Sequence, residues 1–157
     1  MVLKYYSYTI VFQEIPDEIS LCFEITGCPL RCAGCHSPHL RNHKLGEELS
    51  EGVLKELLEK YKNFITCVLF FGGEWEEGSL VERLDTCKSY DLKTALYTGR
   101  DAISKRLKDK LDFLKTGPYI EELGGLADSK TTNQILINVK TGEKLNVYSP
   151  HRGSTKN

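Results

Sequence analysis

The sequence predicts an α/β fold whose parallel sheet does not close into a complete barrel. Segments rich in β-branched and aromatic residues alternate with segments that carry apolar residues at helical spacing, which is typical of β–α units. The segment 67–71 is apolar throughout, as in a strand buried on both faces. A closed barrel of eight β–α units takes roughly 250 residues, whereas the chain has 157. We therefore expect an open βα barrel or a short open sheet, formed as one domain over residues 1–157.

Local composition predicts the elements in order along the chain. Two strands, at 4–12 and 19–26, are separated by a turn at Pro16-Asp17. A long connection over 27–49 follows, and long loops in small domains are usually functional. Ser50 then caps a helix, with apolar residues at helical spacing up to Tyr61. The remaining expected elements are strands at 66–71, 93–98 and 111–116, helices at 79–90 and from Asp101 to about Lys110, and a hairpin of 134–139 and 144–148.

Composition and charge argue against several classes of protein. Residues of hydrophobic type make up 40% of the chain and aromatic residues 10%, so intrinsic disorder is not expected. The chain has 21 Lys+Arg and 22 Asp+Glu, a net charge of −1, which argues against nucleic acid or an anionic membrane as partner. No apolar run approaches the ~18 residues of a membrane-spanning helix. The first 14 residues lack the apolar region of a signal peptide, so we expect a cytoplasmic protein.

Three of the six cysteines lie close together in the long connection. Cys28, Cys32 and Cys35 have the spacing C-x3-C-x2-C. Thiolates are soft ligands that suit zinc, Cu(I) and iron–sulfur clusters, and a tight group of cysteines in a reduced compartment indicates metal binding or catalysis rather than disulfides. The other three cysteines are expected to be small buried side chains: Cys22, Cys67 and Cys87.

Two kinds of metal site are compatible with three clustered thiolates. A structural zinc site usually takes four protein ligands, and His36 or His39 is available as the fourth in a Cys3His site. A [4Fe–4S] cluster commonly takes four cysteines. With three, one iron is left for a molecule from outside the protein. The C-x3-C-x2-C spacing favours the cluster.

Two further loops are expected beside the cysteine loop. Gly72-Gly73 follows the buried strand, and Thr98-Gly99 ends the next one. Ligands bind at the carboxyl ends of parallel strands, so the loops after Thr26, Phe71 and Thr98 should share one edge of the sheet. Paired glycines let the backbone approach a ligand closely. Taken alone, however, Gly-Gly is more typical of an ordinary strand-to-helix turn.

At the cysteine loop the sequence resembles the radical S-adenosylmethionine (SAM) superfamily, whose cluster motif has the same spacing. The resemblance implies an incomplete, TIM-like βα barrel in which Cys28, Cys32 and Cys35 hold three irons of a [4Fe–4S] cluster. SAM would chelate the fourth iron through its amino and carboxylate groups. One electron from the cluster would then cleave SAM into methionine and a 5′-deoxyadenosyl radical, so the cofactor carries the chemistry and the protein orients it.

The resemblance also implies a set of SAM contacts and no catalytic side chain beyond the cofactor ligands. The segment 72–74 stands at the family's GGE-like motif, which holds the SAM amino group. The pair at 98–99 stands at another position of SAM contact, and the residues that flank the third cysteine would lie beside the adenine. An ordinary loop role for His36 is an equal alternative. The implied SAM contacts are Gly34, His36, Gly72, Gly73, Glu74, Thr98 and Gly99.

Within that superfamily, the short chain resembles the activating proteins of anaerobic (class III) ribonucleotide reductase. The stretches TGCPLRCAGCH, LYTGRD, 117–123 and 131–134 match in order, so the resemblance covers roughly residues 20–135. It implies hydrogen abstraction from a glycine Cα in the glycyl-radical subunit of the reductase, with a flavodoxin-like electron donor. An open barrel suits this reaction, because a glycine carried by a protein must reach the site.

Several positions depart from that subfamily, and other functions are compatible with the chain. The subfamily's Gly-Gly-Asp-Pro is Gly-Gly-Glu-Trp here. Arg31, Arg100 and Lys130 are basic residues near the predicted site, and each is more typical of a solvated surface charge than of a ligand for the SAM carboxylate. The alternatives are a radical SAM enzyme with another glycyl-radical partner or a small-molecule substrate, and a zinc or iron–sulfur module without catalysis.

Overall fold

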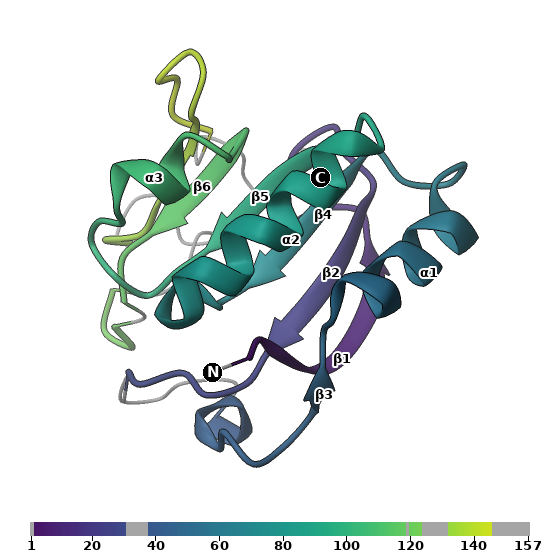
Figure 1. Cartoon of the computed structure of the whole chain (residues 1–157). Helices are drawn as coiled ribbons and strands as arrows, with labels where there is room; N and C mark the ends of the chain where they lie inside the picture. Colours follow the sequence, from purple (N-terminus) through teal and green to yellow (C-terminus); the bar gives the residue numbers. More distant parts are fainter. Residues whose placement is uncertain (1, 31–37, 119, 124–131, 146–157) are drawn as a thin grey trace.

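The computed structural model describes residues 2–30, 38–118, 120–123 and 132–145. Within these residues, seven strands form one mixed sheet in the order β3-β1-β2-β4-β5-β6-β7 (Figure 1). The strands are β1 (Lys4–Val11), β2 (Ser20–Ile25), β3 (Glu47–Glu48), β4 (Cys67–Phe71), β5 (Lys93–Tyr97), β6 (Phe113–Thr116) and β7 (Ile135–Asn138).

The centre of the sheet is parallel and its margins are antiparallel. Strands β2, β4, β5 and β6 are parallel neighbours in chain order, whereas β1, β3 and β7 pair antiparallel. Helices α1 (Glu51–Tyr61), α2 (Glu77–Ser89) and α3 (Lys105–Lys108) connect successive parallel strands and cover one face of the sheet (Figure 1). The 3-10 helices η1 (Pro38–Arg41) and η2 (Glu74–Glu76) lie in the loops after β2 and β4.

Each face of the sheet has its own apolar layer, because successive strand residues point to opposite faces. In β4, Val68 and Phe70 pack toward the helices, together with Leu58 of α1 and Leu84 of α2. Cys67 and Leu69, which alternate with them in sequence, belong to a second layer on the other face. That layer includes the buried residues Ile15, Cys22, Ala95, Tyr97, Phe113 and Leu136.

The predicted α/β class and the open sheet are confirmed, since the sheet has two edges, at β3 and β7. The likeness to a radical SAM barrel stays a prediction. The Ser50 cap is confirmed, because the backbone N–H of Val53 donates to its Oγ at 3.2 Å. Of the predicted hairpin, the first arm is β7, which an isolated bridge joins to the second arm between Ile137 and Lys144. The rest of the second arm, 146–148, lies outside the described residues.

The predicted helix start at Asp101 is wrong. Helix α3 begins at Lys105, and its cap is Ser104, whose Oγ accepts a hydrogen bond from Leu107 N at 3.2 Å. Arg100 is still held at the sheet, because its carbonyl accepts a hydrogen bond from Gly117 N at 2.7 Å. The chain therefore uses residues 101–103 to cross from the sheet to the helical layer. The sequence also did not predict η1 and β3 within the connection at 27–49.

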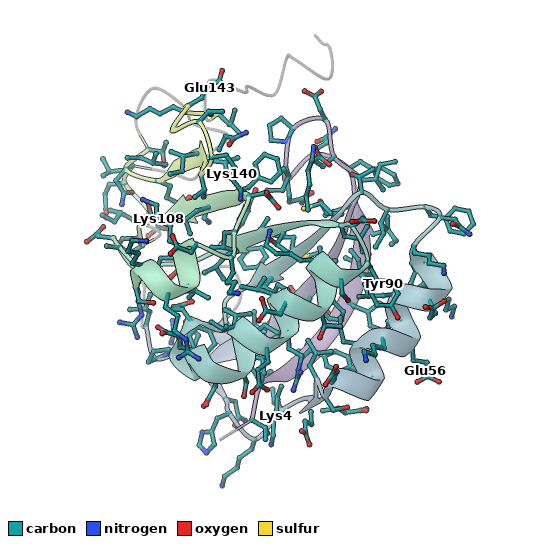
Figure 2. The ribbon with its side chains drawn as sticks, turned by 45° about the horizontal axis from the view of Figure 1, so that its top comes forward. Lys4, Glu56, Tyr90, Lys108, Lys140 and Glu143 are labelled. Carbon is teal, nitrogen blue, oxygen red and sulfur yellow. The ribbon has the colours of Figure 1, made fainter. Side chains whose placement is uncertain are left out.

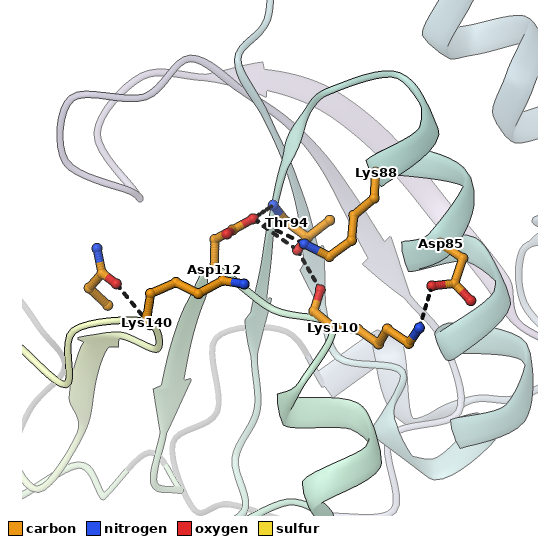
Figure 3. A network of polar contacts seen from close by, with 7 residues as sticks. Asp85, Lys88, Thr94, Lys110, Asp112 and Lys140 are labelled. Atoms are coloured by element: carbon orange, nitrogen blue, oxygen red, sulfur yellow. Dashed lines mark hydrogen bonds and ion pairs between the residues drawn. The ribbon is translucent and has the colours of Figure 1, made fainter.

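A polar network joins the helical layer to the edge of the sheet opposite the predicted site (Figure 3). Asp112 accepts hydrogen bonds from the backbone N–H of Thr94 at 2.9 Å and from its hydroxyl at 3.3 Å. The Asp112 carboxylate also lies 3.6 Å from Lys88 Nζ on α2. Lys110 Nζ pairs with Asp85 Oδ1, also on α2, at 2.8 Å. These contacts hold α2 against the strands whose other ends form the site.

The outer surface carries charges of both signs. Glu56 on α1, Lys108 on α3 and Glu143 near β7 are exposed and point outward (Figure 2). Among the described residues, every helix is too short or too polar to cross a membrane.

Candidate functional site

The loops after the parallel strands are joined to one another at the carboxyl edge of the sheet. Gly72 N, after β4, donates to Tyr97 O at 2.9 Å, and Thr98 N, after β5, donates to Lys115 O at 2.9 Å. These bonds continue the ladder of the sheet into the loops. The loops after Phe71 and Thr98, which were predicted to share one edge of the sheet, therefore begin side by side.

The start of the cysteine loop is hydrogen-bonded to the 3-10 helix η1, which follows this loop in sequence. The backbone N–H groups of Gly27 and Cys28 both donate to Leu40 O, at 2.7 and 3.0 Å. Since Leu40 belongs to η1, this helix closes the base of the loop and holds Cys28 at the sheet edge. Cys28 is half-buried there. The other predicted residues of the loop lie outside the described residues: Cys32, Gly34, Cys35 and His36.

Four of the predicted site residues line one pocket. Cys28 comes from the cysteine loop, Gly72 from the loop after β4, and Thr98 and Gly99 from the loop after β5. The pocket encloses about 120 Å³ and opens to solvent. Ligand pockets usually have about 300 Å³ or more, so a ligand of the size of SAM would extend through the open mouth.

A row of three side chains from adjacent strands forms one wall of this pocket. Phe71, Tyr97 and Lys115 are register partners on β4, β5 and β6. The rings of Phe71 and Tyr97 meet edge to face with centroids 5.4 Å apart. Lys115 Nζ lies 4.5 Å from the Tyr97 centroid and 5.6 Å from that of Phe71. The wall therefore offers aromatic surface and one positive charge, which suits a ligand with an apolar body and an anionic group.

The three residues of the predicted Gly72-Gly73-Glu74 motif lie in three different environments. Both glycines have positive φ, 97° and 114°, which L side chains rarely adopt. Only Gly72 lines the pocket, because Gly73 faces the core, where a Cβ would lie 3.1 Å from Leu3 Cδ1. Glu74 is buried and turns toward Arg100, whose Nε lies 3.4 Å from Glu74 Oε2.

Burial raises the pKa of the Glu74 carboxyl above its usual value. The Glu74 backbone N–H, the Thr98 hydroxyl and the Arg100 guanidinium oppose this change in pKa without reversing it. Glu74 and Arg100 line a second hollow, together with Ser104. The carboxylate of Glu74 therefore does not reach the pocket that contains Cys28.

Two stretches that carried the resemblance are in contact. Gln134 Nε2 donates to Gly117 O at 3.3 Å, and Asn133 Nδ2 donates to Pro118 O at 3.0 Å. Gln134 is buried and also lines the pocket. The chain just after β6 and the chain just before β7 thus form the far end of the site.

The sequence did not single out Lys115, Tyr97, Trp75 or Gln134 as lining residues. For Lys115 a signal was available, because a lone lysine near the end of the short strand Phe113–Thr116 interrupts an apolar pattern. For Trp75 the signal was the departure from Gly-Gly-Asp-Pro, which had no structural meaning before the fold was known.

The cysteines of the described residues differ in their suitability as ligands. Cys22 and Cys67 are buried, and burial is the main cause that raises the pKa of each thiol to about 12. They are therefore uncharged at neutral pH, whereas metal ligation needs a thiolate. Cys28 is more accessible and faces the pocket, which fits a cluster ligand. Among the described residues alone, no group of three His, Cys, Asp or Glu side chains is placed to bind a metal.

Comparison with known proteins identifies the kind of domain. Residues 19–137, most of the chain, match the family described as the 4Fe-4S single cluster domain. The chain belongs to this family. Membership in the 4Fe-4S single cluster domain family supports an iron–sulfur cluster, rather than zinc, as the group that the cysteine loop holds.

Part of the chain is also similar to the pyruvate formate-lyase-activating enzyme of Clostridium pasteurianum. The two are 38% identical over 79 residues, which cover 46% of this chain and 33% of the relative. The chain thus matches about a third of the length of this relative.

Proposed function

We propose that the chain is a radical SAM glycyl-radical activase, with residues 1–157 as a single radical SAM domain. Cys28, Cys32 and Cys35 would hold a [4Fe–4S] cluster, and SAM would bind at its remaining iron. The observation that carries this proposal is the pocket in which Cys28 lies with Gly72, Thr98 and Gly99. The family match and the similarity to an activating enzyme also support it.

The described residues suggest how SAM would be oriented. Lys115 is the proposed partner of its carboxylate, because it stands in the aromatic wall of the pocket. Arg41 also lines the pocket, whereas Arg100 is paired with Glu74 outside it. Within the Gly72-Gly73-Glu74 turn, the amino group would meet the backbone at Gly72, because Gly73 faces the core and the Glu74 side chain turns away. The rings of the pocket wall would exclude water from the reacting sulfonium. Thr98 and Gly99 would form the opposite side, and Gly34 and His36 are the proposed adenine contacts.

The proposed reaction produces a radical on a protein. A bound cluster would supply the electron for splitting SAM into methionine and a 5′-deoxyadenosyl radical, and this radical would take a hydrogen atom from a glycine Cα. The chain's own part is to keep SAM in one orientation and the mouth of the pocket open to a glycine on another protein. A flavodoxin-like protein is the proposed electron donor.

The proposed partner is the glycyl-radical subunit of anaerobic ribonucleotide reductase. The stretches 117–123 and 131–134 resemble that subfamily, and the hydrogen bonds from Gln134 and Asn133 to residues 117 and 118 join them at the pocket. A second candidate partner is pyruvate formate-lyase, favoured by the similarity to its activating enzyme.

The test is anaerobic reconstitution followed by SAM turnover. The protein should turn brown, bleach with dithionite and release methionine and 5′-deoxyadenosine. With the correct partner, electron paramagnetic resonance should then detect a glycyl-radical doublet. Ribonucleotide reductase and pyruvate formate-lyase are tested in parallel, so the doublet identifies the partner.

Cysteine variants test the ligand assignment. Cys28→Ala and Cys32→Ala should lose the brown colour and keep the circular dichroism of the wild type. Cys87→Ala is the matched control, because Cys87 is buried in α2 and should leave the cluster intact. A colourless protein that binds zinc would contradict the proposal. SAM cleavage without a doublet on either partner would favour a small-molecule enzyme instead.

A further inference from the structure

Trp75 is the single tryptophan of the chain, and it stands between the cysteine loop and the loop after β4. It belongs to η2, directly after Gly72-Gly73-Glu74. Its ring is half-buried, packs against the helical core layer and lines the pocket that contains Cys28. One side chain therefore contacts the protein interior, the pocket and both loops.

The contacts of Trp75 with the cysteine loop are polar and steric. Its Nε1–H donates to the carbonyl of Thr26 at 3.2 Å. A Cβ on Gly27 would lie 3.1 Å from Nε1 and 3.8 Å from Cδ1 of the ring. Trp75 therefore holds the two residues that directly precede Cys28.

The other edge of the ring lies against the loop after β4. A Cβ on Gly72 would be 2.6 Å from Cη2 of Trp75, closer than carbon atoms approach in proteins. The indole thus occupies the space that glycine leaves free at both Gly27 and Gly72. The two loops are spaced by the width of this ring.

We propose that Trp75 is a positioning residue that fixes Cys28 relative to the Gly72 turn and so preforms the cluster end of the pocket. The proposal rests on the proposed function only in that it takes Cys28 to be a cluster ligand. Two restraints then act on the start of the cysteine loop: the Trp75 contacts with Thr26 and Gly27, and the bonds of Gly27 and Cys28 to Leu40 O. Without the indole, the first of these restraints is lost and the bonds to Leu40 O remain.

The first measurement uses the reconstituted protein and the rate at which a chelator removes its iron. Trp75→Phe keeps an aromatic ring but loses the hydrogen bond to Thr26. The net free energy of one such bond corresponds to iron release that is roughly two- to tenfold faster. Trp75→Ala also loses the packing and should release iron about tenfold faster or more. Leu58→Ala is the matched control, because Leu58 is fully buried in α1 on the helical face. It should destabilise the fold and leave iron release close to that of the wild type.

The second measurement uses the metal-free protein. Amide hydrogen exchange at Gly27 and Cys28 should be faster in Trp75→Ala than in Leu58→Ala, compared at equal global stability in urea. Equal exchange in the two variants, or equal iron release, would overturn the role proposed for Trp75. If the wild type takes up no iron, the proposed function fails, and the exchange rates of the metal-free protein still decide whether Trp75 holds the loop.

Discussion

The ammonium group of Lys115 lies 4.5 Å from the centroid of the Tyr97 ring, at a position where only 9% of the lysine is exposed. The two residues are register partners on β6 and β5. Burial of a charge is costly unless it is compensated, and the electron-rich face of an aromatic ring provides part of that compensation. A positive charge is thereby kept at the aromatic wall of the pocket, which Arg41 and Gln134 also line.

Replacing Lys115 by methionine should weaken SAM binding. The variant keeps most of the length of the side chain and removes its charge, so we expect KM for SAM to rise about tenfold, equivalent to about 1.4 kcal/mol. The visible absorption of the cluster should not change. Lys108→Met, at an exposed lysine on α3 (Figure 2), is the control and should behave as the wild type. An unchanged KM in Lys115→Met would exclude the lysine as the carboxylate partner.

The buried thiols should resist alkylation in the native, metal-free protein. Burial raises the pKa of Cys22 and Cys67 to about 12, so at pH 8 only about one thiol in 10⁴ is the reactive thiolate. Cys28 is more accessible and should react first with iodoacetamide. Mass spectrometry of the labelled peptides measures the order. Labelling of Cys22 as fast as that of Cys28 in the folded protein would contradict the structure.

Replacing Glu74 by glutamine should change stability in a pH-dependent way. Burial raises the pKa of the carboxyl in the folded state, so below its unfolded value near 4.5 both states are protonated and no penalty exists. As the pH rises above that value, the unfolded state ionises more readily and the wild type loses stability. The variant lacks this loss.

The stability of Glu74→Gln relative to the wild type should therefore be higher at pH 7 than at pH 4. Urea unfolding at the two pH values measures the difference. Glu56→Gln, at an exposed position on α1 (Figure 2), is the control and should show little dependence. A relative stability that falls between pH 4 and pH 7 would mean that the ion pair with Arg100 outweighs burial.

Removing the cap of α3 should lower the free energy of unfolding more than replacing Asp101, the residue that the sequence predicted as the start of this helix. Ser104 accepts a hydrogen bond from Leu107 N and donates one to Glu77 Oε1 at 2.8 Å. Ser104→Ala should lower the free energy of unfolding by about 1 kcal/mol, whereas Asp101→Ala should change it by about 0.5 kcal/mol or less. Thermal or urea unfolding decides between the two, and equal losses would contradict the observed cap.

Local pattern was enough to predict most of the fold. The apolar run at Cys67–Phe71 forms a central strand, as predicted. Ser50 caps α1, which was also predicted. The start of α3 was wrong because the length of the crossing from sheet to helix depends on where Gly117 holds Arg100. That hydrogen bond joins residues far apart in sequence, so the local sequence pattern cannot predict it.

The sequence alone was enough to predict the chemistry proposed for the candidate site, because the spacing of Cys28, Cys32 and Cys35 is a local property of one loop. It also determined the parallel strands, since their composition is local. Only the tertiary structure decided which side chains line the pocket. Lys115 faces it because residue register sets which face of the sheet a side chain occupies, and Trp75 contacts Gly27 and Gly72 because two loops meet at one edge. Such contacts arise between distant segments, and their partners become neighbours only when the chain is folded.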